Sequence, residues 1–144
     1  MAQSLGDLFT KEIKEKLLSI DLALKGIILI KIPEFVSVTY DKYAIICLTS
    51  TCNGFIGIIP INTEKPLSGN YITLTKSEYK FFKYDSHVNC DFISDRPVNE
   101  IKEFLLNNPN SILGEITDFQ HLQITQRLQA SKLITPKQKK KYNL

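Results

Sequence analysis

The sequence predicts an α+β fold in which short antiparallel strands form a small, strongly bent and partly closed β-barrel. Short apolar segments separated by turn signals fill the middle of the chain, and segments with helical periodicity lie mainly at its two ends. The 144 residues fit a single domain that can bury a core without metals or disulfides. An open antiparallel sheet with helices on one face is the alternative.

Residues 1–25 are expected to form a helix that packs on this domain. Apolar residues recur at helical spacings of three and four, and Ser4 and Asp7 have the spacing of a capping box. Gly26 can adopt the left-handed conformation that ends such a helix.

Five strands and a short closing strand are expected to follow. Each is a short apolar or alternating run, and Asn53-Gly54 is a turn signal between two of them. Gly57 indicates a bend or a bulge, and Pro60 indicates a strand end or an edge strand. The expected strands are residues 26–33, 43–49, 55–61, 71–75, 86–93 and 111–115.

A helix is expected to open at Ser94-Asp95, because Arg96-Pro97 follows and an N-cap with an early proline is typical of a helix start. Asn107-Asn108-Pro109 is expected to stop it. The inner face of this helix comprises Val98, Ile101, Phe104 and Leu105.

The last helix is expected to start at a capping box formed by Thr117 and Gln120. Its apolar side comprises Leu122, Ile124 and Leu128. Thr135-Pro136 is expected to end the compact part, so that residues 26–135 form the barrel domain with its helices and residues 136–144 form a basic tail.

The sequence predicts a soluble, cytoplasmic protein with no membrane partner. Its apolar runs are far shorter than the ~20 residues that a membrane-spanning helix needs, and its N-terminus lacks the basic region of a signal peptide. The three cysteines form no disulfide framework, and Cys47 is expected in the core.

No cofactor or metal is expected. The chain has no Gly-rich phosphate loop, no dinucleotide fingerprint, no nucleophile elbow and no zinc-ligand spacing. The net charge of +3 is only mildly basic. However, five lysines lie within the last thirteen residues. Such a segment can attract phosphate, or it can simply be a solvated, frayed end.

Two places could carry chemistry. Residues 62–65 follow a buried strand directly, where polar groups are both held and exposed, although a simple capped turn would look the same. Residues 84–87, with Asn89, contain His87, which titrates near neutral pH, and Asp85, which could orient it or raise its pKa. A solvent-facing strand start is the alternative for His87, and His121 is interpreted as structural.

Aromatic and basic residues alternate over residues 76–84. Aromatic faces interleaved with lysines suit single-stranded nucleic acid, although Phe81 and Phe82 could as easily belong to the core. The residues concerned are Lys76, Tyr79, Lys80, Phe81, Phe82, Lys83 and Tyr84.

The order of these pieces resembles the MazF/PemK family. The matching segments are residues 26–33 (GIILIKIP), 43–48 (YAIICL), 58–63 (IIPINT), 85–88 (DSHV) and 112–116 (ILGEI), before a final helix. The resemblance covers about Gly26 to Ser131 and rests on pattern rather than on letter identity. It implies a small SH3-like barrel that forms a homodimer.

The resemblance also implies an endoribonuclease that cuts single-stranded RNA without metal and whose RNA groove is covered by an antitoxin peptide. Such cleavage needs activation of a 2′-hydroxyl, stabilisation of charge on the phosphate and protonation of the leaving 5′-oxygen. Thr63 matches the family's Thr/Ser after the third strand. The family's catalytic arginine and the proline after it have no counterpart, because residues 41–44 read DKYA.

The leading hypothesis is therefore a toxin of a toxin–antitoxin or phage-defence system. Lys42 would stabilise the phosphate, Thr63 would position it, and His87 with Asp85 would move protons. The residues expected to bind RNA are Lys65, Lys80, Lys83 and Tyr84.

Two other hypotheses stay open. The missing arginine favours a barrel that binds RNA or a protein partner in the same groove without cutting. A structural adaptor that docks a partner's peptide on a sheet edge is the third hypothesis.

Overall fold

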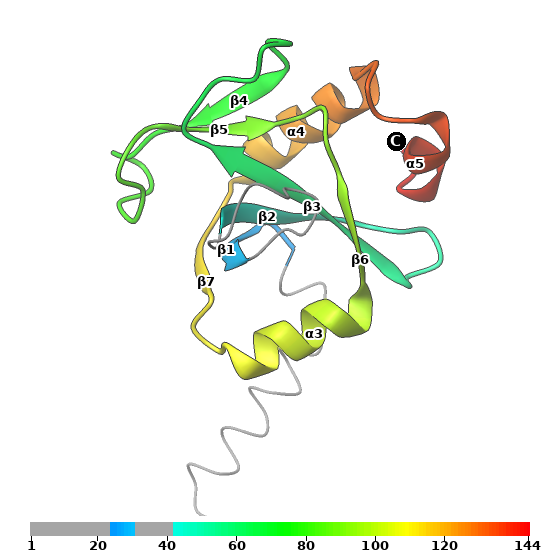
Figure 1. Ribbon diagram of the computed structural model, residues 1–144, viewed down its shortest axis with the longest axis horizontal. Coiled ribbons are helices and arrows are strands. Elements are labelled where there is room, and N and C mark those ends of the chain that lie inside the picture. Colours follow the sequence, from blue (N-terminus) through cyan, green and yellow to red (C-terminus); the bar gives the residue numbers. More distant parts are fainter. Residues whose placement is uncertain (1–23, 31–41) are drawn as a thin grey trace, which may run out of the picture.

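The computed structural model describes residues 24–30 and 42–144. Within these residues, seven strands form one curled antiparallel sheet, and the fold is an α+β half-barrel with helices packed on the sheet (Figure 1). The helix expected over residues 1–25 falls almost wholly outside the described residues. No described helix is both long enough and apolar enough to cross a membrane.

The strands follow one another in space in the order β4-β5-β3-β2-β1-β7, while β6 pairs with β3. Each expected strand is present, although the one expected over residues 86–93 ends at Asn89 and the first is described only as far as Ile30. The strands are β1 (Gly26–Ile30), β2 (Lys42–Thr49), β3 (Phe55–Asn62), β4 (Tyr71–Leu74), β5 (Ser86–Asn89), β6 (Ser94–Pro97) and β7 (Ile112–Glu115).

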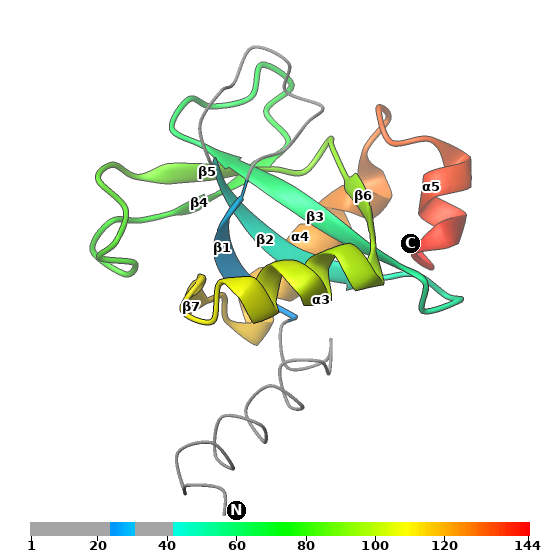
Figure 2. The same cartoon turned by 60° about the horizontal axis from the view of Figure 1, so that its bottom comes forward.

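The central strands β1, β2 and β3 are buried on both faces, which explains their nearly continuous apolar sequences. On one face, Ile45 and Ile59 pack in a core that includes α4 (Asp118–Ala130). On the other face, Ile46 and Ile58 pack against α3 (Val98–Asn107). Figure 2 shows the two helices on opposite sides of the sheet.

A β-bulge in β2 lies opposite Gly57. The register between β2 and β3 shifts between Ile46 and Leu48, so that Cys47 and Leu48 both reach the same core. A Cβ at Gly57 would lie 3.0 Å from side-chain atoms of Leu48 and Ile93. The expected irregularity at Gly57 is confirmed, although the extra residue belongs to the facing strand.

Pro60 lies inside β3 and not at its end. One edge of β3 pairs with β6 over residues 55–58 and with β5 over residues 61–62. Pro60, which has no backbone donor, falls where the partner strand changes. The expectation that Pro60 marks a strand end or an edge strand is therefore wrong, because β3 is an inner strand and the gap between its two partners tolerates proline.

The helix start expected at Ser94-Asp95 is also wrong. Residues 94–97 form β6, which satisfies the edge of β3, and α3 begins only after Pro97. The other features of α3 agree with the sequence, because Ile101 and Leu105 are buried and Asn108 is the C-cap.

The expected capping box begins α4. Thr117 Oγ1 accepts a hydrogen bond from the Gln120 N–H, and Gln120 Oε1 accepts one from the Thr117 N–H. Ile124 and Leu128 are buried as expected, but Leu122 is 51% exposed. Leu122 lies two residues before Ile124, which turns it to another side of the helix.

The chain does not end in a free basic tail. Residues Pro136–Lys141 form α5, which begins at the Thr135 cap, and Tyr142 is only 4% exposed and joins the core of α4. Thr135-Pro136 therefore starts a helix instead of ending the compact part, in line with the preference of proline for the first helical turn.

Candidate functional site

The described residues line a cavity of about 640 Å³ where β2, β3 and β5 meet the loop of residues 63–70. Three of the predicted site residues, Lys42, Thr63 and Lys65, come together in its wall. The lining residues are Lys42, Tyr43, Ile61, Asn62, Thr63, Glu64, Lys65, Pro66, Leu67 and Asn89.

Strand pairing places three polar residues side by side on one face. Lys42 Nζ donates a hydrogen bond to Asn62 Oδ1, so a cation from β2 reaches β3. Asn62 is in turn the cross-strand partner of His87 on β5. Burial lowers the pKa of the Lys42 amine. The sheet thus brings Lys42 and His87 to either side of one amide.

His87 is held inside the sheet and is 6% exposed. Its Nδ1 lies 2.9 Å from Thr73 Oγ1 on β4, and its ring contacts Tyr71 edge-on at 5.1 Å between centroids. Burial lowers the pKa of His87 and the charge of Lys65 lowers it further, against the weaker opposing effect of Asp85. The lowered pKa favours the neutral imidazole at pH 7.

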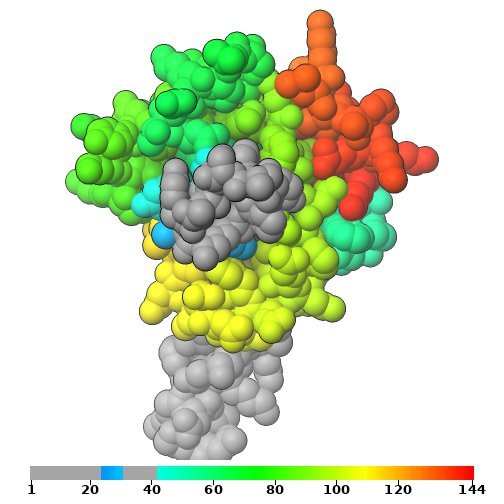
Figure 3. All heavy atoms as spheres, in the orientation of Figure 1, coloured from blue at the N-terminus to red at the C-terminus, as the bar shows by residue number. Residues whose placement is uncertain are grey.

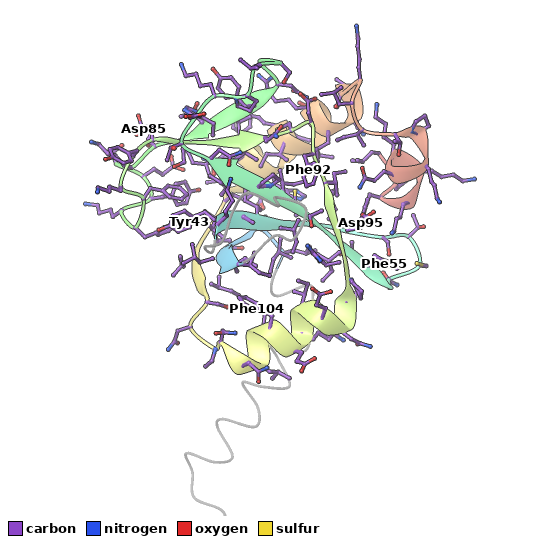
Figure 4. The ribbon with its side chains drawn as sticks, viewed as in Figure 1. Tyr43, Phe55, Asp85, Phe92, Asp95 and Phe104 are labelled. Atoms are coloured by element: carbon purple, nitrogen blue, oxygen red, sulfur yellow. The ribbon has the colours of Figure 1, made fainter. Side chains whose placement is uncertain are left out.

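Asp85 does not orient His87. Its Oδ1 accepts a hydrogen bond of 2.9 Å from the backbone N–H of Lys76, which closes the turn between β4 and β5. Figure 4 shows Asp85 at the edge of the molecule, beside that turn. The Asp85 carboxylate affects the His87 imidazole only through electrostatic attraction over a distance.

The predicted stacking surface is mostly core. Tyr79 and Phe82 are buried, and Phe81 packs so closely on Gly114 of β7 that a Cβ there would lie 2.8 Å from its ring. Tyr84 alone of the four aromatics is exposed, at 56%, with Lys83 Nζ 5.6 Å from its ring centroid. The core interpretation of Phe82, and largely of Phe81, is confirmed.

The buried aromatics bridge the gap between the two outer strands, β4 and β7. Tyr79 Oη lies 2.6 Å from Gln120 Oε1 of α4 and 3.2 Å from the Glu115 carbonyl oxygen of β7. Tyr43, labelled in Figure 4, donates a 3.2 Å hydrogen bond to the Phe81 carbonyl and meets the Phe82 ring edge-on. Side chains from the β4–β5 turn therefore cover the open side of the half-barrel.

Sequence reasoning missed Asp91, which lies outside the cavity and anchors the cavity loop through hydrogen bonds. Its backbone N–H donates to Asn89 Oδ1 at 3.0 Å, and its carboxylate accepts hydrogen bonds from Ser68 and Asn70 of the cavity loop. The carboxylate also accepts a 2.6 Å hydrogen bond from Ser131, beyond α4. The alternation of residues 86–93, which puts Asp91 on the side of His87 and Asn89, was the available signal.

His121 and Cys47 have structural surroundings. His121 Nε2 lies 2.9 Å from the Cys47 carbonyl oxygen at the bulge, and Cys47 itself is buried in the core, where burial raises its pKa to about 12. Among the described residues, no cluster of His, Cys, Asp and Glu side chains could hold a metal ion.

No model of a known protein family matches the chain, and no curated protein matches it either. The resemblance to the MazF/PemK family stays a prediction.

Proposed function

We propose that the chain is a diverged MazF/PemK-like, SH3-like barrel that cuts single-stranded RNA without a metal, as the toxin of a toxin–antitoxin or phage-defence system. The observation that carries the proposal is the meeting of Lys42, Thr63 and Lys65 in one cavity, beside the strand that bears His87. RNA cleavage by its own 2′-hydroxyl needs a base and stabilisation of charge on the phosphate, which a neutral imidazole and a lysine can supply, and a threonine hydroxyl can position the phosphate.

In this proposal the neutral His87 takes the proton of the 2′-hydroxyl. The 2′-oxygen forms a bond to phosphorus, the bond to the 5′-oxygen breaks, and the leaving oxygen takes a proton from solvent. Lys42 offsets the charge on the phosphate, as a point charge rather than as the two-pronged clamp of an arginine. Thr63, exposed at the start of the cavity loop, positions the phosphate.

Cleavage of unstructured RNA in EDTA tests this proposal. We expect Lys42→Ala and Thr63→Ala each to lower the rate by about 10² or more, because each removes a group aimed at the reacting phosphate. The control is Lys102→Ala on α3, outside the cavity, which should cut at the wild-type rate. If the wild-type chain cuts no RNA in EDTA and its expression does not slow growth, the enzymatic proposal fails.

The burial of His87 favours a second candidate, a barrel that binds RNA without cutting it. An imidazole that is 6% exposed and already bonded to Thr73 needs a rearrangement before it can reach a substrate. This candidate predicts salt-dependent RNA binding, no cleavage products, and an affinity that His87→Ala leaves unchanged. Analysis of the RNA after incubation separates the two candidates.

The proposed partners, a second copy of the chain and an antitoxin peptide, rest on the resemblance alone. Light scattering of the purified chain measures the first. A small acidic protein encoded in the neighbouring reading frame, tested for co-purification with this chain, would support the second.

A further inference from the structure

The C-terminal part of the chain is strongly segregated in charge. No aspartate or glutamate occurs between Phe119 and Leu144, the stretch that contains most of α4 and all of α5. The six cationic residues of this stretch are Arg127, Lys132, Lys137, Lys139, Lys140 and Lys141. The net charge of the whole molecule is only +3, but residues 119–144 carry a local excess of positive charge.

Two of these lysines fasten α5 to the rest of the molecule. Lys139 Nζ donates hydrogen bonds of 2.8 and 2.7 Å to the carbonyl oxygens of Gln129 and Ser131, at the end of α4. Lys141 Nζ lies 3.6 Å from Asp95 Oδ2 and 3.6 Å from the centroid of the Phe55 ring. The segment is thus a docked helix with fixed charges.

The other four cations, Arg127, Lys132, Lys137 and Lys140, are exposed around this docked helix. We call them the basic lobe. Figure 3 shows the end of α4 and α5, in orange and red, standing out at one side of the molecule. Figures 1 and 2 both place α5 on the side away from the β4–β5 turn, so the lobe is separate from Lys80 and Lys83.

We propose that the basic lobe is a second contact surface for the backbone of single-stranded RNA. The inference rests on the proposed function, because a protein that cuts RNA must bind this polyanion. The four exposed cations of the lobe attract phosphates independently of sequence, and they outnumber Asp91 and Asp95, the carboxylates that contact this part of the chain. A folded segment also loses less freedom on binding than a loose tail.

Strand β3 joins the lobe to the cavity. Its first residue, Phe55, lies under Lys141, and its last residue, Asn62, lies in the cavity wall. Eight residues of strand separate the two places by about 23 Å. Arg127 lies nearer to the cavity, because its carbonyl oxygen accepts a 3.1 Å hydrogen bond from Asn70 of the cavity loop. An RNA that only fills the cavity cannot reach the lysines of α5, whereas a longer RNA can.

The test compares RNAs of about 4 and about 16 nucleotides, the range of single-stranded sites on small barrels. Their 2′-hydroxyls are methylated so that they cannot be cut. The variant carries Lys132→Gln, Lys137→Gln and Lys140→Gln. The control carries Asn99→Asp, Lys102→Gln and Asn110→Asp, which remove the same net charge on and after α3.

We expect the lobe variant to bind the long RNA at least about tenfold more weakly at low salt, with a salt slope lower by about 2, as the loss of three phosphate contacts requires. Its affinity for the short RNA should equal that of the wild type. The control should match the wild type for both RNAs.

An equal loss in the lobe variant and the control would overturn the inference and leave the proposed function standing. A wild-type chain that binds neither RNA would overturn both. If the lobe variant loses binding to phosphatidylserine vesicles but keeps its affinity for the long RNA, the surface belongs to a lipid partner and the inference fails.

Discussion

At Gly57 a hydrogen atom in place of a side chain lets β3 approach its neighbours. The bulge in β2 turns Leu48 toward this position, and Ile93 approaches from the segment between β5 and β6. Both neighbours belong to the core, so neither can move without disturbing other contacts.

Replacing Gly57 by alanine should therefore lower the free energy of unfolding by about 1–3 kcal/mol, the usual cost of overpacking a core. Urea unfolding measures the change. Gly54→Ala is the matched control, because a Cβ at Gly54 meets only Cys52 Sγ at an ordinary 3.6 Å. Equal effects of the two substitutions would contradict the close approach at Gly57.

Single residues were predictable where local chemistry decides their place. Thr117 and Gln120 form their capping box because three residues separate them, whatever the rest of the fold does. Whether Tyr79 and Phe81 are buried depends instead on their packing against β7 and α4, which lie more than thirty residues further along the chain. Interleaved lysines could not reveal that these rings face inward.

At the scale of elements, α5 shows how a segment rich in lysine can still be part of the core. Tyr142 Oη donates a 2.5 Å hydrogen bond to Asp95, and its ring is buried with residues of α4. Burial and the carboxylate of Asp95 both raise the pKa of the Tyr142 hydroxyl, which stays protonated as a donor.

Tyr142→Ala should cost about 3–5 kcal/mol of unfolding free energy, as for other large buried rings. Thermal or urea unfolding measures the loss. Tyr84→Ala, which removes an exposed tyrosine, should change stability by no more than about 0.5 kcal/mol. A small effect of Tyr142→Ala would mean that α5 does not stabilise the domain.

Element type was predictable for β2, β3 and α4, whose apolar patterns are long. The four residues of β6 were not, because Ser94 and Arg96-Pro97 imitate a helix start and only the open edge of β3 makes them a strand. Polar residues directly after the buried strand β3 indicated a binding site, so the place of Thr63 and Lys65 in the cavity wall could be predicted. The alternation of residues 86–93 placed Asp91 beside Asn89 but could not reveal its role, since its other partners come from two distant segments, the cavity loop and Ser131.

At the scale of the whole molecule, Asp91 ties the cavity loop to the C-terminal part of the chain. Burial alone would raise the pKa of its carboxyl, but the hydrogen bonds from Asn70, Ser131 and Ser68 outweigh burial and lower it. The ionised form therefore stabilises the fold above the ordinary carboxyl pKa of 3.8, and this contribution is lost as the pH falls through the lower, folded value.

Asp91→Asn should lower stability at pH 7 by about 1–3 kcal/mol, because it removes a charged acceptor shared by three donors. It should also make stability less dependent on pH below pH 4. Urea unfolding at pH 7 and pH 3 measures both effects, with the exposed Glu64→Gln in the cavity loop as the control. An unchanged pH dependence in Asp91→Asn would contradict this assignment.

The pairing of Gly26 with Glu115 has a consequence for how the protein is made. Strand β1 must wait for a partner about 90 residues later in the chain, and translation at about 5–20 residues per second makes that a delay of several seconds. During this time one apolar edge of the nascent chain has no partner, and such edges invite pairing with other chains. We expect the yield of folded protein to depend on chaperones that cover this edge during synthesis, which soluble yields with and without a co-expressed chaperone would measure.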